Sequence, residues 1–409
     1  MSDFLGFTLI ILKLWLQVII SPLFLMLVLV VAWQYRRMQN FSQRLFPTEK
    51  GMYLRATLMS TLFGIGGGVL GSAGLLALGI DLARMGIVYL FITAILLMLI
   101  HPRFLCFAYA GGIVSVSHLL FGWPDVSVAQ LMGLVAVLHM VESVLIYLSG
   151  HIDSVPLYLE TERFGVVGGF NLQKFWPIPL VAVMKALEPQ GGGSLVKMPE
   201  WWPLFQDSSA ISSSVTYMLL PIIAVLGYGE ITATAFPREK SKISARNLFC
   251  FSLGLLVVSL VASYHPSFAP LAALFGPLGH ETVIWLGLKA EKETPPIFVM
   301  PERGIMVLDV LRGSAAAQAG IKTGDIVLTI NGLPVNTLEE VETVLRYYWG
   351  PLQLQVERGE SILSFSLAKR PGGGIGIIPV PESRTPGLRG RRAASPLDYM
   401  RERWKRFRP

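Results

Sequence analysis

The chain has 409 residues, of which 53% are hydrophobic and only 15% are charged. Soluble domains carry about 25% charged residues, so this composition, with a mean hydropathy of +0.56, excludes an ordinary soluble protein and predicts a polytopic membrane protein. The formal net charge of +7 comes entirely from the last 26 residues, which hold nine Lys or Arg and two acidic residues. This is a basic tail and not a basic protein, so we expect no nucleic-acid partner.

A bilayer crossing needs a run of about 20 apolar residues, and about seven to eight segments meet or approach that length. The first seven are Phe7–Trp33 with a break near Pro22, Tyr53–Ile80, Gly86–Ile100, Phe104–Phe121, Val128–Leu148, Thr216–Phe236 and Leu248–Tyr264. The eighth, Phe268–Leu288, contains two prolines, His280 and Glu281, and either spans, lies in the interface or enters and returns. We predict a polytopic α-helical membrane bundle over residues 1–292.

The bundle carries an insert outside the membrane at about residues 150–214. Within it, Val155–Leu159 and Phe164–Phe170 are predicted to form two short strands around a turn. Basic residues favour the cytoplasmic side of short loops, which suggests an outside N-terminus, an inside C-terminus and a cytoplasmic insert. The loop Arg238–Arg246 fits this scheme poorly. The basic residues that carry the argument are Arg36, Arg37, Arg44, Arg103 and those of the tail.

Glycines, ionisable residues and two cysteines occur inside the apolar runs. Gly66-x-Gly68-x-x-Gly71 matches a dinucleotide fingerprint by letter, but it lies in an apolar run and predicts small-residue faces for close helix packing. His139 and Glu142 share one helix face, with His151 beyond its end, and we favour structural pairing over ion transport. The two cysteines, Cys106 and Cys250, lie in apolar runs, which predicts buried packing thiols, no disulfide, no zinc site and no cofactor.

Residues 293–370 carry the most specific pattern in the chain. Gly304-Ile305-Met306-Val307 is followed by Gly313-Ser314 and then by Ala319–Gly332, which contains the run Thr323-Gly324-Asp325-Ile326. Thr337 with Glu340 forms a capping box for a helix at Leu338–Tyr347. This stretch resembles a bacterial PDZ domain, a small α+β fold.

The PDZ resemblance implies a peptide site. In such domains a peptide adds a strand between a sheet edge and a helix, and its carboxylate meets backbone amides. We expect Ile305–Leu308 to be that edge strand. The alternative is a structural PDZ domain without a ligand. The expected peptide-binding residues are Arg303, Gly304, Ile305, Met306, Val307, Val341, Val344 and Leu345.

One motif raises the alternative of an intramembrane metalloprotease. Such enzymes carry His-Glu-x-x-His on a helix, where two imidazoles hold zinc and the Glu acts as base. Here His280-Glu281 is followed by Ile284 in the second His position, and isoleucine cannot ligate a metal. We therefore predict no catalytic or metal-ligating residue, and keep a metalloprotease, or a catalytically dead relative that regulates proteolysis, as the second hypothesis. A transporter with a regulatory PDZ domain is a third, disfavoured by the scarcity of buried charge.

The tail, residues 371–409, is rich in Pro, Gly and Arg, and we expect it to be disordered. Its end, Asp398–Arg408, can form an amphipathic helix on anionic lipid. A solvated tail is the alternative. The expected membrane-surface residues are Arg401, Arg403, Trp404, Lys405, Arg406, Phe407 and Arg408.

The layout as a whole resembles the MinJ family of division-site scaffolds in Gram-positive bacteria. The local likeness rests on Leu138–Glu142, on Gly150-His151 with Val155-Pro156, on Val167–Leu180 and on Gly279–Glu281. The resemblance implies a multi-pass membrane protein with a cytoplasmic PDZ domain that bridges a DivIVA-like protein and a MinD-like ATPase. The basic tail has no counterpart that we can match to that family. We predict a non-enzymatic membrane scaffold that recruits cytoplasmic partners in division-site selection or polar localisation.

Overall fold

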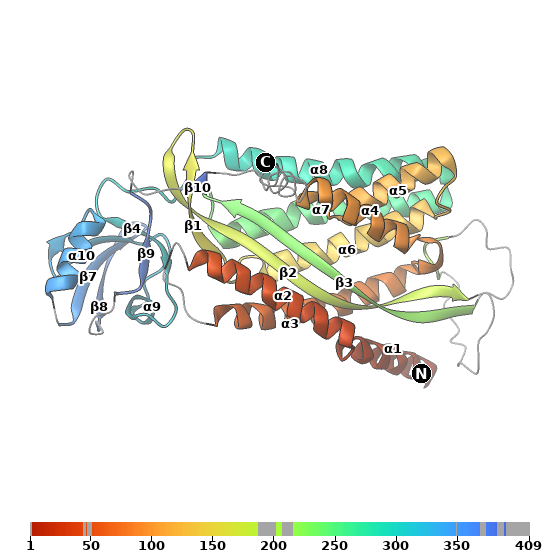
Figure 1. The fold of residues 1–409 in the computed structure, drawn as a ribbon, viewed down its shortest axis with the longest axis horizontal. Helices are drawn as coiled ribbons and strands as arrows, with labels where there is room; N and C mark the ends of the chain where they lie inside the picture. Colours follow the sequence, from red (N-terminus) through yellow and green to blue (C-terminus); the bar gives the residue numbers. More distant parts are fainter. Residues whose placement is uncertain are drawn as a thin grey trace, which may run out of the picture.

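The computed structural model has a helical unit crossed by a long β-hairpin, with a small β domain at one end of its long axis (Figure 1). The described residues are 2–43, 46, 51–186, 202–206, 216–348, 350–368, 374–382 and 388–389.

The helical unit contains eight α-helices among the described residues. They are α1 (Ser2–Ile19), α2 (Pro22–Ser42), α3 (Met52–Leu78), α4 (Ile87–Ile100), α5 (Phe107–Phe121), α6 (Val128–Ser149), α7 (Pro237–Tyr264) and α8 (Ala269–Glu293). Four helices are long and apolar enough to cross a membrane, and α1 with α2, which are bent by 51° at their junction, would make a fifth. The helices α4 and α5, with 14 and 15 residues, are shorter.

One predicted membrane segment is wrong. Thr216–Phe236 is not a helix, because Thr216–Thr232 forms strand β3. It pairs antiparallel with β2 (Gly165–Ala186), from Phe170 opposite Thr232 to Ala186 opposite Thr216. A continuous apolar run does not by itself distinguish a helix from a strand, and in β3 the buried Ala224 and Leu226 alternate with apolar residues that are exposed, such as Val225. Here β2 supplies the partner, and Trp176, Ile178 and Val181 at its centre are fully buried.

The two short strands predicted in the insert are present, and the second is longer than expected. β1 (Val155–Thr161) pairs antiparallel with the start of β2, which continues to Ala186. β10 (Leu388–Arg389) runs parallel to β1, so the sheet order is β10-β1-β2-β3.

The glycines of α3 allow that helix to lie directly on the hairpin. Gly64 and Gly68 face the backbone of Pro177 and Pro179 in β2, while Gly67 faces Leu145 of α6. The expectation of close packing through small residues is therefore confirmed, but one partner is a strand and not a helix.

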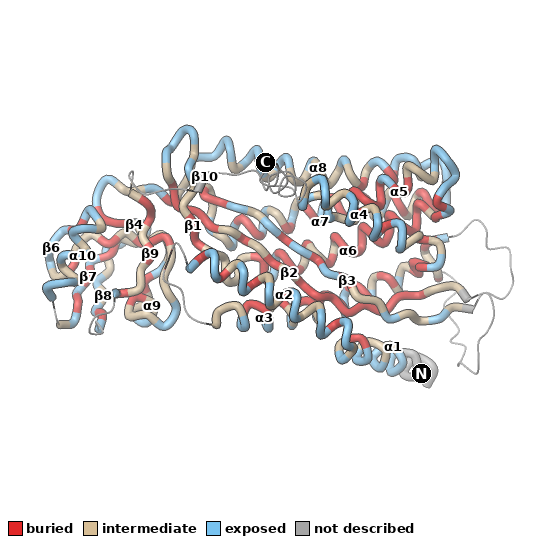
Figure 2. Tube along the Cα trace, in the orientation of Figure 1, coloured by how far each residue is buried: buried red, intermediate tan, exposed pale blue. Residues whose placement is uncertain are grey.

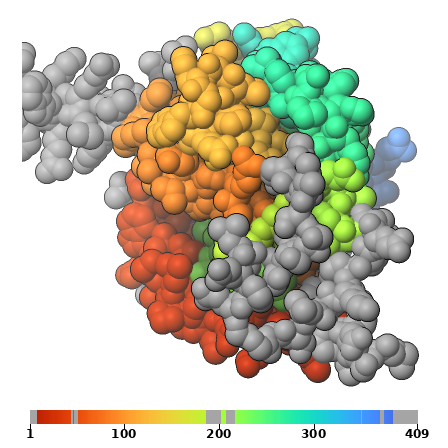
Figure 3. Space-filling model, turned by 90° about the vertical axis from the view of Figure 1, so that its right-hand side faces the viewer, coloured from red at the N-terminus to blue at the C-terminus, as the bar shows by residue number. Residues whose placement is uncertain are grey.

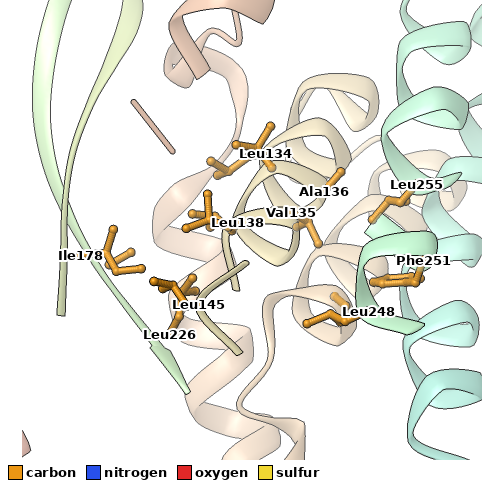
Figure 4. Close-up of a cluster of buried hydrophobic side chains, with 14 of the residues drawn as sticks. Leu134, Val135, Ala136, Leu138, Leu145, Ile178, Leu226, Leu248, Phe251 and Leu255 are labelled. Carbon is orange, nitrogen blue, oxygen red and sulfur yellow. The ribbon is translucent and has the colours of Figure 1, made fainter. Parts of the chain in front are cut away.

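The core of the helical unit is centred on α6, the most buried of the candidate spans (Figure 2). Its leucines lie between Ile178 and Leu226 of the hairpin on one side and Leu248 and Phe251 of α7 on the other (Figure 4). By contrast, only a few residues of α8 are buried although the helix is apolar, and the rest are half-buried or exposed. Seen from the end opposite the β domain, α4 and α5 lie beside α7 and α8 (Figure 3). Such outward apolar surface is stable only against lipid or protein.

The C-terminal domain is a six-stranded sheet with two short helices. Its elements are β4 (Ile305–Val310), α9 (Ala315–Ala319), β5 (Ile326–Ile330), β6 (Leu333–Pro334), α10 (Leu338–Tyr347), β7 (Leu352–Arg358), β8 (Ser361–Leu367) and β9 (Ile377–Pro379). The strand order is β8-β7-β5-β4-β9, with β6 beside β5. Thr337 and Glu340 form the predicted capping box of α10.

Part of the predicted disordered tail is ordered. β9 lies inside residues 371–409 and pairs antiparallel with β4, so Ile377–Pro379 belong to the domain sheet. A three-residue strand after a run of glycines carries no periodic signal, which is why the composition of this stretch predicted disorder instead.

The β domain packs directly against the helical unit. Gly168 of β2 donates its N–H to the carbonyl oxygen of Phe298 at 2.8 Å, and Leu308 of β4 belongs to the same buried cluster as Phe298. Arg312 forms an ion pair of 2.7 Å with the buried carboxylate of Asp153. The domain is thus held in place by apolar, backbone and ionic contacts.

Candidate functional site

The strand expected to border a peptide groove lies inside the sheet. β4 pairs with β5 on one side and with β9 on the other, so the prediction that Ile305–Leu308 forms an edge strand is wrong. Gly304 already donates its N–H to Asn336 Oδ1 at 2.9 Å, and Val307 is 1% exposed in the domain core. The sheet order therefore does not fit the peptide-binding role expected for Arg303, Gly304, Ile305, Met306 and Val307.

The sheet edge on this side is β9. Leu311 N–H donates to Gly376 and Val380 N–H donates to Met306, so the backbone groups at Gly376 and Val380 face β4. Backbone groups alternate along a strand, and those of Ile377 and Pro379 face away from β4. Among the described residues, β9 has no second strand partner. Pro379 has no N–H, and prolines within sheets are found mainly on edge strands.

The helix α10 begins beside the end of β9. Glu382, three residues after β9, accepts a hydrogen bond of 2.8 Å from Leu338 N–H at the first turn of α10. Val341, Val344 and Leu345 are half-buried against the domain core. Ahead of β9 lies a glycine-rich turn, in which Gly376 has a φ of +85°. An open edge, a glycine turn and a neighbouring helix are the parts that a PDZ peptide site uses.

A phenol from the helical unit contacts this edge. Tyr158 of β1 donates its O–H to the carbonyl oxygen of Pro379 at 2.9 Å. One outward acceptor of β9 is therefore already engaged, and Ile377 offers the remaining backbone N–H of the strand.

A buried ion pair supports the domain from within. Arg358 of β7 contacts both carboxylate oxygens of Asp325 at 2.7 Å and donates to Gly320 carbonyl oxygen at 2.8 Å. Lys322 N–H donates to the same carboxylate at 2.8 Å, and the hydrogen bond to Asp325 raises the pKa of Arg358. The pair fixes the turn between α9 and β5, which contains Gly324 at a φ of +88°.

Nearby, Asp309 of β4 lines a cavity of about 350 Å³ between the domain and the helical unit, together with His151, Asp153 and Arg312. Burial raises the pKa of Asp309 from 3.8 to about 6.

A second cluster of polar side chains lies inside the helical unit. Cys106 Sγ lies 3.2 Å from His139 Nε2 and 3.6 Å from His280 Nε2. The three residues come from the start of α5, the middle of α6 and the middle of α8, and their ligand-type atoms all lie within 4.8 Å of one another. His139 Nδ1 lies 2.7 Å from the carbonyl oxygen of Val135.

The neighbouring Glu281 points elsewhere. One of its carboxylate oxygens accepts a short hydrogen bond from Arg103 and the other accepts one of 2.5 Å from Tyr109. Both oxygens are thus engaged outside the Cys-His cluster.

Sequence reasoning missed two features. The first is β9, whose only signal was the run Gly372-Gly373-Gly374-Ile375-Gly376 at the end of the domain. The second is the meeting of Cys106, His139 and His280, which follows no motif spacing. Conversely, the predicted membrane-surface residues Arg401, Arg403, Trp404, Lys405, Arg406, Phe407 and Arg408 lie outside the described residues.

The comparisons with known proteins agree with this division into two parts. A PDZ domain model matches residues 286–368, a range that ends before β9. MinJ of Bacillus subtilis, a cell division topological determinant, is 23% identical over 237 residues, which is 57% of this chain and 55% of MinJ. The chain is a MinJ-like protein with a PDZ domain. It spans about half the length of MinJ, and its apolar helices make it a membrane protein.

Other matches are confined to lengths typical of one small domain. The putative serine protease HhoB of Synechocystis is 35% identical over 79 residues, or 19% of this chain and 18% of HhoB. Human serine protease HTRA3 is 40% identical over 78 residues, or 19% and 17%. The structure of the HtrA3 PDZ domain bound to a phage-derived ligand is 35% identical, covering 17% of this chain and 64% of that chain at a TM-score of 0.16. These are PDZ matches and do not extend over the proteases.

Proposed function

We propose that this MinJ-like protein is a non-enzymatic, multi-pass membrane scaffold in cell-division site selection or polar localisation, and that its PDZ domain recruits cytoplasmic partners. The edge of β9 carries the proposal, because among the described residues it has strand β4 on one side only and lies beside the first turn of α10. The similarity to MinJ supports the division role. DivIVA-like and MinD-like proteins are the candidate partners, with the PDZ domain in the cytoplasm.

Strand addition explains how such an edge recognises a partner. A peptide strand bonds to outward backbone groups for affinity, and pockets for alternate side chains supply specificity. Because Pro379 has no N–H, the β9 edge offers fewer donors, and the amides of the turn at residues 374–376 and the apolar side of α10 must contribute more. We therefore propose that Val341, Val344 and Leu345 contact the peptide together with Ile377.

The test is capture of a candidate partner peptide by the full-length protein in detergent. Val344→Glu places a charge beside the proposed peptide, and burying it costs on the order of 2 kcal/mol or more, which is at least a tenfold loss of affinity. Thr343→Glu is the matched control, because it adds the same charge one residue away on the exposed side of α10. Circular dichroism checks that both variants fold. Equal binding by the two folded variants would sink the proposed site.

The contacts of Glu281 give less support to the alternative function, a metalloprotease. A general base must have a carboxylate oxygen directed at the attacking water, whereas both oxygens of Glu281 are engaged by Arg103 and Tyr109. Ile284 also occupies the position of the second histidine. A cleaved substrate that disappears in the Glu281→Gln variant would overturn the non-enzymatic proposal.

A further inference from the structure

We propose that Cys106, His139 and His280 form a binding site for one zinc ion that ties α5, α6 and α8 together. The three residues are far apart in the sequence, and only the fold brings their side chains to one point. The proposal stands apart from the PDZ domain and its partners.

The separations match a tetrahedral metal site. Zinc binds sulfur at about 2.3 Å and imidazole nitrogen at about 2.0–2.1 Å, so a tetrahedral angle places the two ligand atoms about 3.5 Å apart. The observed distances from Cys106 Sγ are 3.2 Å to His139 Nε2 and 3.6 Å to His280 Nε2. One ion can contact all three atoms once the two imidazole nitrogens, which lie within 4.8 Å of each other, stand about 3.3 Å apart.

The tautomer of His139 is set for metal binding. The carbonyl oxygen of Val135 can only accept a hydrogen bond, so His139 Nδ1 carries the proton. The Nε2 atom therefore presents its lone pair toward Cys106 Sγ. An imidazole that donates its other N–H to a backbone carbonyl is the usual arrangement for a metal-bound histidine.

His280 is the weaker imidazole ligand. Its Nδ1 is buried and has no hydrogen-bond partner among the described residues. With a metal on Nε2, Nδ1 would carry a proton that no described group accepts. Loss of His280 should therefore cost less affinity than loss of His139.

The start of α5 provides one contact that favours a thiolate at Cys106. Cys106 is the N-cap residue of α5, and Ala108 N–H donates to its sulfur at 3.4 Å. A helix N-terminus stabilises negative charge and lowers the cost of the thiolate that zinc requires. The ring of Phe251 packs edge-on against the rings of both histidines, which excludes water from that side.

One thiolate and two neutral imidazoles suit zinc, a borderline-soft ion, better than magnesium or calcium, which prefer oxygen ligands. The role is structural, because the ion would join α5 and α6 to α8, which follows α6 in the chain only after strands β1 to β3 and α7. Binding displaces the thiol proton of Cys106, and no other bond changes.

The test uses the full-length protein, reduced and freed of metal, in detergent. Co²⁺ replaces Zn²⁺ as a spectroscopic probe, because a thiolate ligand gives a sulfur-to-cobalt charge-transfer band. We expect one equivalent of Co²⁺ with that band, its displacement by Zn²⁺, and a rise of Tm with Zn²⁺. Cys106→Ser should abolish the band. His139→Ala should weaken binding by more than the about 10–100-fold typical of losing an outer partner.

The chain offers matched controls. Cys250→Ser changes the other free cysteine, which is exposed on α7, and His265→Ala changes an exposed histidine just after α7. Both should bind Co²⁺ as the native protein does. The Tm of each variant without metal shows whether Cys106→Ser and His280→Ala fold. The proposal is overturned if the native chain binds no stoichiometric Co²⁺ or Zn²⁺, if folded Cys106→Ser keeps the band, or if Cys250→Ser loses it.

Discussion

The close approach of α3 to the β-hairpin can be tested at a single glycine. A Cβ at Gly68 would overlap the carbonyl oxygen of Pro179 and would lie 3.0 Å from its Cδ and 3.1 Å from its carbonyl carbon. These are backbone and ring atoms that cannot rotate away, so Gly68→Ala must push the helix off the strand. That shift also disturbs Ser72, which accepts from Val181 N–H at 2.9 Å and donates to Gly68 carbonyl oxygen at 2.7 Å.

The magnitude follows from three contributions. Overpacking costs about 1–3 kcal/mol, and a weakened hydrogen bond costs about 0.5–1.5 kcal/mol. Replacing glycine by alanine within a helix returns about 1 kcal/mol. Gly66→Ala is the matched control on the same helix, because no atom lies within 4 Å of its Cβ position; it should gain about 0.5–1 kcal/mol. Because both variants gain the alanine contribution, they should differ by the other two, about 1.5–4.5 kcal/mol in their free energies of unfolding.

Thermal unfolding of both full-length variants in the same detergent measures this difference. The Tm of Gly68→Ala should lie several degrees below that of Gly66→Ala. Equal Tm values, or a higher Tm for Gly68→Ala, would show that the helix and strand tolerate separation and that the close contact contributes nothing.

Three further outcomes are expected. Arg358→Met leaves the buried carboxylate of Asp325 without its ion pair. It should destabilise the PDZ domain by about 2–3 kcal/mol in denaturant unfolding. This is less than the about 3–5 kcal/mol for breaking a fully buried pair, because the Arg358 side chain is 32% exposed. The control Arg346→Met, on the exposed face of α10, should be near neutral in the same assay. Asp309 has a folded pKa of about 6, above its ordinary 3.8, so the folded state binds its proton more tightly and stability should fall as pH rises from about 4 to about 6. Asp309→Asn should remove that slope and raise the Tm at pH 7, and an unchanged pH profile would contradict the assignment. A peptide of residues 395–409 should bind anionic vesicles but not neutral ones, and salt should weaken the binding; equal binding to both vesicles in a sedimentation assay would refute the predicted lipid contact.

The sequence predicted the parts whose signals are local. The capping box at Thr337, the helix after it and the small-residue face of α3 all follow from short spacings, and all are present. The strand at Thr216–Thr232 was mistaken for a helix because its apolar run matches both structures, and only its pairing with β2 distinguishes them.

The same limit applies to the sites. Whether β4 lies at an edge depends on β9, a three-residue strand about 70 residues later in the chain. The Cys-His cluster likewise depends on how α5, α6 and α8 pack. Neither is a property of any one segment, so no local pattern could reveal it.

The contacts of Gly168 with Phe298, of Asp153 with Arg312 and of Tyr158 with Pro379 have a consequence for geometry. A domain on a flexible linker samples many directions, and each captured partner then loses rotational freedom on further assembly. A domain fastened at three points to the first strands of the helical unit presents its sheet edge in one direction. A peptide strand added at the β9 edge would therefore have one fixed direction relative to the helical unit.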